Sequence, residues 1–152
     1  MLSAYPDARV IWTHRDPAKL VPSLASLNSA MQMPFTRKLN APRVGEYWAG
    51  KVDTAIDRAI SFDTSADRSW CCHVQYQDLI SDPQQTLQRI YNHFDTSTNE
   101  LHLQRVKAWL GQSPQHSAGT HRYDPADFGW TKGSLNKRYR DYRERYQIPG
   151  EV

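Results

Sequence analysis

A chain of 152 residues with 39% hydrophobic and 11% aromatic residues is long enough to bury a core of its own. Its small formal net charge of +3 and its aromatic content exclude the composition typical of intrinsically disordered chains. No segment approaches the roughly 20 apolar residues that cross a bilayer, and the first residues lack a basic end followed by an apolar run. We therefore expect a cytoplasmic protein without a membrane partner.

The first predicted elements are a buried strand and a helix. Residues 8–13, ARVIWT, form a β-branched and aromatic run typical of a parallel strand. Asp16 can cap a helix that starts at Pro17, where a proline ring is tolerated. Four apolar residues then follow at helical spacing: Leu20, Leu24, Leu27 and Met31. Pro22 lies inside this helix and removes one backbone hydrogen bond, so we expect a kink beside Ser23.

A second strand follows a loop and a long helix. Residues 32–42 contain two prolines and favour a loop, and apolar residues recur every three or four positions between residues 44 and 62. Residues 70–76, WCCHVQY, return to strand character, which predicts a parallel pair joined by a right-handed crossover. Because two strands are few for a parallel sheet, we expect the edge beside residues 8–13 to be uncovered and open to self-association.

The remaining chain predicts three further helices. Asp82 and Pro83 repeat the cap-and-proline signal, and Ser97 with Glu100 resembles a capping box. One face of a basic terminal helix carries Leu135, Tyr139, Tyr142 and Tyr146. Cations interleaved with tyrosines could bind nucleic acid, but a single helical face of tyrosines is more typical of packing. We therefore expect no nucleic-acid partner.

Neither the cysteines nor the histidines predict a metal or catalytic centre. Cys71 and Cys72 are adjacent in a predicted strand and point to opposite faces, which favours reduced, packed thiols. None of the six histidines has a partner at metal-ligand spacing, and no catalytic triad can be recognised, so we assign no metal ligand and no catalytic residue. His14 and His121 have the best functional claim, although a structural role is favoured for both.

Arg15 and Ser23 are the candidate binding residues. Arg15 lies just beyond the carboxyl end of the first strand, where open α/β sheets bind ligands, and Ser23 follows eight residues later. A guanidinium and a hydroxyl suit a phosphate group. The alternative pairs Arg15 with Asp16 or Asp7 and lets Ser23 bond its own helix backbone. Spacing alone favours that alternative.

Three segments resemble sulfotransferases, especially their bacterial branch. Residues 5–27, YPDARVIWTHRDPAKLVPSLASL, are similar to the strand, turn and helix that bind the 3′-phosphate of PAPS, 3′-phosphoadenosine 5′-phosphosulfate. The resemblance implies that Arg15 and Ser23 hold this phosphate. Residues 76–94 resemble a second family segment, which implies that Tyr76 packs near the adenine. Residues 121–130 and 139–146 resemble the C-terminal part of the same branch.

The resemblance also implies a fold and an activity. The expected fold is α/β, a three-layer P-loop-like nucleotide-binding domain whose incomplete parallel sheet is flanked by helices, with residues 1–152 as its C-terminal part. The expected reaction is sulfuryl transfer from PAPS to a hydroxyl or amine of a small-molecule acceptor, which releases PAP, adenosine 3′,5′-bisphosphate. The family's phosphosulfate loop and catalytic histidine have no match here, so we expect a truncated chain that is inactive alone. The alternative is a non-catalytic nucleotide-binding or interaction remnant.

Overall fold

The chain divides into two compact units. The computed structural model describes residues 3–65, 68–112 and 122–150. The first unit comprises Met1–His14 and Asp67–His121, and the second comprises Arg15–Ala66 and Arg122–Val152. Within the described ranges, no helix is both long enough and apolar enough to cross a membrane.

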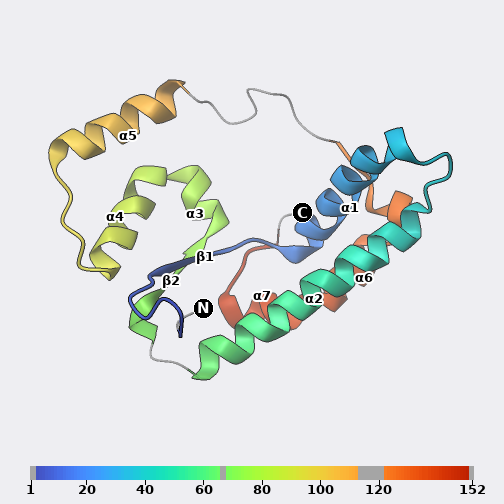
Figure 1. Ribbon diagram of the computed structural model, residues 1–152, viewed down its shortest axis with the longest axis horizontal. Helices are drawn as coiled ribbons and strands as arrows, with labels where there is room; N and C mark the ends of the chain where they lie inside the picture. The colour runs from blue at the N-terminus through green and yellow to red at the C-terminus, as the bar shows by residue number, and fades with distance from the viewer. Residues whose placement is uncertain (1–2, 66–67, 113–121, 151–152) are drawn as a thin grey trace. The chain divides into compact units, whose positions relative to one another are not determined.

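The first unit contains the predicted parallel strand pair (Figure 1). Its elements are β1 (Val10–His14), η2 (Arg68–Trp70), β2 (Cys71–Gln75), α3 (Tyr76–Ser81), α4 (Pro83–His93) and α5 (Glu100–Gln112). β1 and β2 pair in register from Val10 opposite Cys71 to His14 opposite Gln75. Among the described residues the sheet has only these two strands. The predicted α/β class with an incomplete parallel sheet is therefore confirmed.

A small core joins β2 to α4. Cys72, Val74 and Ile90 are buried together, because alternate residues of the strand meet the apolar stripe of the helix. Both cysteines are buried thiols, as predicted. The predicted start of α4 is also confirmed, since the Asp82 carboxylate accepts a hydrogen bond from the Gln85 amide at 3.0 Å.

The predicted capping box of α5 is wrong by two residues. α5 begins at Glu100, and the side chain of Asn99 accepts a hydrogen bond from the His102 amide at 2.8 Å. Asn99 therefore takes the role that the sequence analysis gave to Ser97. Asparagine and serine are comparable caps, so composition alone could not choose between them.

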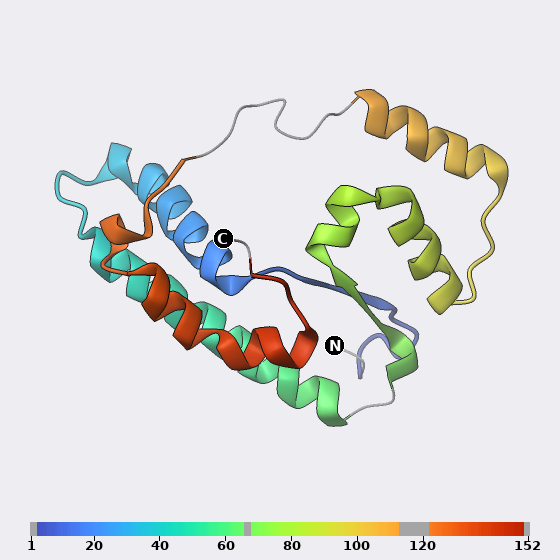
Figure 2. The same cartoon turned by 180° about the vertical axis from the view of Figure 1, so that it is seen from behind.

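The second unit is helical. Its elements are α1 (Pro17–Gln32), η1 (Met33–Phe35), α2 (Ala41–Ser65), η3 (Pro125–Phe128), α6 (Lys132–Arg138) and α7 (Arg140–Tyr146). Figures 1 and 2 show α1 and α6 lying along the long helix α2. Val21 and Ala25 of α1 and Ala49 of α2 form one buried cluster with Phe128, Trp130, Leu135 and Tyr139. Gly45 permits this packing, because a Cβ there would lie 2.9 Å from the Phe128 Cβ.

The buried face of α1 differs from the predicted one. Val21, Ala25 and Ser29 are buried at four-residue spacing, whereas Leu27 and Met31 of the predicted stripe are exposed. Small residues at the buried positions let α1 approach α2 closely. The helix runs through Pro22, which is fully buried.

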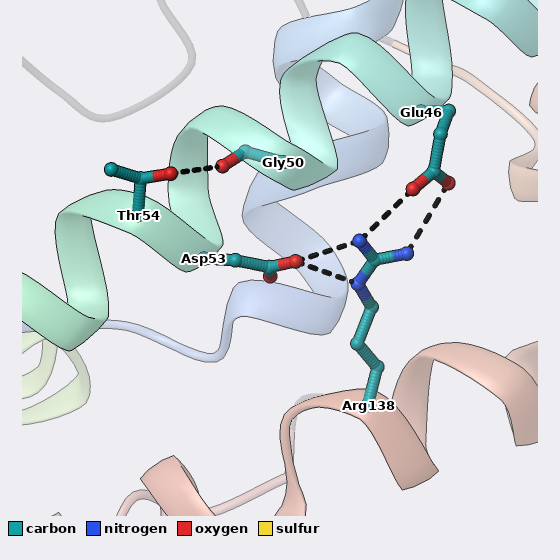
Figure 3. Close-up of polar contacts among 5 residues, drawn as sticks. All are labelled: Glu46, Gly50, Asp53, Thr54 and Arg138. Carbon is teal, nitrogen blue, oxygen red and sulfur yellow. Dashed lines mark hydrogen bonds and ion pairs between the residues drawn. The ribbon is translucent and has the colours of Figure 1, made fainter.

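The predicted terminal helix is two short helices that meet at Tyr139. The Tyr139 backbone caps both α6 and α7 with non-helical angles, and α7 ends at Tyr146. The packing role predicted for the tyrosines is supported for Tyr139, which is buried in one cluster with Leu135, and for the buried Tyr142, whereas Tyr146 is half-buried. Arg138, the residue before Tyr139, donates hydrogen bonds to Glu46 and Asp53 of α2 (Figure 3).

Candidate functional site

The turn between β1 and α1 positions Arg15. β1 ends at His14, Arg15 follows with a half-buried side chain, and Asp16 is the N-cap of α1. The buried Asp16 carboxylate accepts a hydrogen bond from the Ala18 amide at 2.9 Å and lies 3.6 Å from the Arg143 guanidinium. These contacts hold the start of the helix in place, and with it the residue that precedes the cap.

Ser23 lies two turns into α1 with a half-buried side chain. Within the part of the chain that the structure describes, its hydroxyl donates no hydrogen bond. Two hydroxyls of α2 do bond their own backbone: Thr54 donates to the Gly50 carbonyl at 2.8 Å (Figure 3), and Ser61 donates to the Asp57 carbonyl at 2.8 Å. Among the described residues, the buried Ser29 hydroxyl of α1 also makes no hydrogen bond. The alternative interpretation, in which Ser23 bonds its own helix backbone, is therefore wrong.

Tyr123 accounts for part of this difference. Its hydroxyl donates a 3.0 Å hydrogen bond to the carbonyl of Lys19, the residue one turn before Ser23. That carbonyl is the acceptor that a back-bonding Ser23 would use. The sequence analysis noted the segment that contains Tyr123 but gave this tyrosine no role, because 100 residues separate it from Ser23 along the chain.

Apart from Asp16, which pairs with Arg143, the charged residues at the turn and along α1 are cations. Lys19 and Ser23 are four residues apart inside α1, so an ammonium and a hydroxyl lie on successive turns, and the Arg15 guanidinium comes just before the helix. Residues 17–45 contain no aspartate or glutamate. A dianionic phosphate would thus meet two cations and an unused hydroxyl donor at the start of one helix.

Tyr76 belongs to the other unit. It is the first residue of α3, directly after β2, and its side chain is half-buried. The sequence analysis placed this residue at the end of the strand, and the structure turns it into the helix. Its position near an adenine stays a prediction.

His14 is buried and contacts the half-buried Trp12 and the exposed His73. Its Nε2 lies 2.8 Å from the Nδ1 of His73, and the two rings stack with centroids 5.1 Å apart. Trp12 packs against both rings. These contacts support the structural role favoured for His14, while His121 lies outside the described residues. Within the described ranges, no three side chains of the metal-binding types gather into a site.

Comparison with known proteins gives consistent matches. A family model described as "Sulfotransferase family" matches residues 1–100. The omega-hydroxy-beta-dihydromenaquinone-9 sulfotransferase Stf3 of Mycobacterium tuberculosis, like its Mycobacterium bovis counterpart, is 26% identical over 125 residues, which cover 80% of this chain and 32% of the relative. This chain therefore spans about a third of the length of these relatives.

Two solved structures share the fold. The crystal structure of sulfotransferase STF9 from Mycobacterium avium superimposes with a TM-score of 0.87 at 27% identity, covering 99% of this chain and 39% of that one. The structure of sulfotransferase STF1 from Mycobacterium tuberculosis gives a TM-score of 0.70 at 27% identity, covering 91% of this chain and 34% of that one.

Proposed function

Because this chain belongs to the sulfotransferase family, we propose that Arg15 and Ser23 bind the 3′-phosphate of the sulfuryl donor PAPS. The observation that carries the proposal is the unused hydroxyl of Ser23. Its nearest backbone acceptor one turn away, the Lys19 carbonyl, accepts a hydrogen bond from Tyr123 instead. A hydroxyl that makes no hydrogen bond within its own helix, and that lies one turn after Lys19, is suited to an anionic ligand.

The roles of the two residues differ in kind. The Arg15 guanidinium offers a planar pair of donors that matches two phosphate oxygens, whereas Ser23 offers one directional donor. Asp16 acts indirectly, because its cap to Ala18 and its ion pair with Arg143 fix the turn from which Arg15 projects. Tyr76 would pack against the adenine, as a half-buried aromatic ring after the second strand can do.

The whole reaction would transfer a sulfuryl group from PAPS to a hydroxyl of a small-molecule acceptor and release PAP. One relative is named for an omega-hydroxylated menaquinone, so a hydroxyl on a hydrophobic molecule is the preferred acceptor class. The contacts at Arg15 and Ser23 position the donor and do not stabilise the charge that develops on the transferred group.

We further propose that the 152-residue chain binds the donor without transferring its sulfuryl group. The chain spans about a third of the length of its relatives, and the segments that match the family serve the 3′-phosphate end of the donor. Loss of a single preorganised hydrogen-bond donor to the transition state commonly lowers an enzyme's rate about 100-fold. Incubation with labelled PAPS and phenol, sugar and long-chain alcohol acceptors should yield no product above a heat-killed control. Product that disappears in Arg15→Ala would contradict this proposal.

Calorimetric titration with PAP tests the binding site. Losing a bidentate, charge-assisted contact costs about 1.5 to 3 kcal/mol, so Arg15→Ala should weaken PAP binding at least about tenfold. Ser23→Ala should have a smaller effect. Two control substitutions remove the same side-chain groups from α2. Arg58→Ala removes an exposed guanidinium, and Ser61→Ala removes a hydroxyl that bonds its own helix backbone. Equal affinities of the wild type and Arg15→Ala would refute the assignment.

A further inference from the structure

The end of the second unit where α1 gives way to α2 exposes a run of large apolar side chains. Figures 1 and 2 show η1 and the segment after it at one end of these two helices. Every residue from 30 to 38 is exposed. The exposed fraction is 64% for Met31, 67% for Met33 and 91% for Phe35. Leu27, one turn before Met31, is 55% exposed. We call this surface, Leu27, Met31, Met33 and Phe35, the apolar tip.

The exposure of the tip follows from how α1 packs. The face of α1 that packs into the core carries Val21 and Ala25, which are fully buried. Leu27 and Met31 share the remaining face because four residues separate them. Single exposed apolar residues are common, but several on consecutive turns mark an interaction surface.

The charged residues that follow the apolar tip along the chain are cations, and the nearby acidic residues Asp124 and Asp127 belong to the η3 region that packs against α2. Arg37, Lys38 and Arg43 follow within eight residues of Phe35, and all three are exposed. Residues 17–45 contain no acidic residue at all. The first one after them, Glu46, accepts hydrogen bonds from Arg138 at 3.1 and 3.2 Å. The partner of this surface should therefore be apolar at its centre and anionic around it.

We infer that the apolar tip docks onto the surface of an anionic phospholipid bilayer. Phe35 and the methionines would enter the boundary between headgroups and acyl chains, while Arg37 and Lys38 contact the phosphates. Exposed apolar side chains beside a group of cations are the signature of such interfacial binding. This inference replaces the expectation of no membrane partner, which rested on the lack of a spanning segment and did not consider surface binding.

Flotation with lipid vesicles tests the inference without any sulfotransferase assay, so its failure would leave the proposed donor site untouched. The complete chain should float with vesicles that contain about one third phosphatidylglycerol at about 0.1 M salt, and at least about tenfold less with pure phosphatidylcholine vesicles. Met33→Ser with Phe35→Ser should weaken binding at least about tenfold. Arg37→Glu with Lys38→Glu should do the same, because each surface cation contributes about fivefold.

Helix α5 supplies matched controls. Leu101 and Trp109 are 55% and 65% exposed there, and Arg105 and Lys107 are exposed cations. Leu101→Ser with Trp109→Ser, and Arg105→Glu with Lys107→Glu, should change binding less than about twofold. No flotation, equal flotation on neutral vesicles, or equal losses in both sets of variants would each overturn the inference. So would a doubled mass in light scattering that the Met33→Ser with Phe35→Ser variant abolishes, because the tip would then bind a second copy.

Discussion

Replacing Arg138 by methionine should destabilise the second unit by about 1.5 to 2 kcal/mol. The guanidinium donates two hydrogen bonds to Glu46, at 3.1 and 3.2 Å, and two to Asp53, at 2.6 and 3.1 Å (Figure 3). Donating hydrogen bonds to these carboxylates raises the pKa of Arg138 above its ordinary value, so the guanidinium stays charged. An exposed ion pair contributes at most about 1 kcal/mol, and the Arg138 side chain remains 32% exposed. Arg138 has two carboxylate partners, Glu46 through both oxygens and Asp53 through one, so we expect a loss of about twice that figure.

Urea unfolding of Arg138→Met measures this loss. The midpoint should fall at an unchanged slope, and the difference from wild type should shrink in about 1 M salt, because exposed charges are screened. Arg140→Met is the matched control. Arg140 is 64% exposed and reaches only Asp141 at 3.5 Å and Glu144 at 3.9 Å, so its loss should stay within about 0.5 kcal/mol. Equal losses in both variants, or a loss that salt does not reduce, would refute the reasoning.

Three other substitutions test the packing of the second unit. Gly45→Ala should lower stability by about 1 to 3 kcal/mol in urea unfolding, because its Cβ would lie 2.9 Å from the Phe128 Cβ, whereas Gly50→Ala meets nothing within 4 Å and should be neutral or stabilising. Asp16→Ala removes a cap and an ion pair and should cost at least about 1 kcal/mol in the same assay, with Asp16→Asn keeping the capping acceptor and losing less. Burial and the nearby Asp53 carboxylate raise the pKa of Tyr139 above its ordinary value of 10.0. The unfolded chain therefore loses this proton at lower pH than the folded chain does, and stability should fall as the pH rises above 10.0. Tyr139→Phe should flatten that alkaline fall and leave stability at neutral pH unchanged; an unchanged pH profile would contradict the assignment.

The parts of the fold that local signals determine were predicted well. The β-branched run, the Asp16 cap and the Pro17 start predicted β1 and α1 to within about two residues, because caps and strand propensities act over a few positions. The same holds for Asp82 and α4. Arg15 and Ser23 were placed on a strand end and a helix by these local signals alone.

Tertiary choices were not readable from the sequence. Leu27 and Met31 match a helical stripe as well as Val21 and Ala25 do, and only the close approach of α2 selects the smaller residues for the core. The hydrogen bond from Tyr123 to the Lys19 carbonyl joins residues 104 positions apart. Sequence periodicity cannot reveal such a contact. The contact matters because it occupies the carbonyl to which Ser23 would otherwise donate.

The central claim is that Arg15 recognises the 3′-phosphate, and a ligand comparison tests it most directly. PAP and adenosine 5′-monophosphate differ only in that phosphate, so titrating both into the wild type and Arg15→Ala isolates its contribution. The account predicts that the wild type prefers PAP by at least about tenfold and that Arg15→Ala loses most of this preference while its affinity for the monophosphate changes little. A preference that survives in Arg15→Ala, or an equal loss of affinity for both ligands, would contradict it.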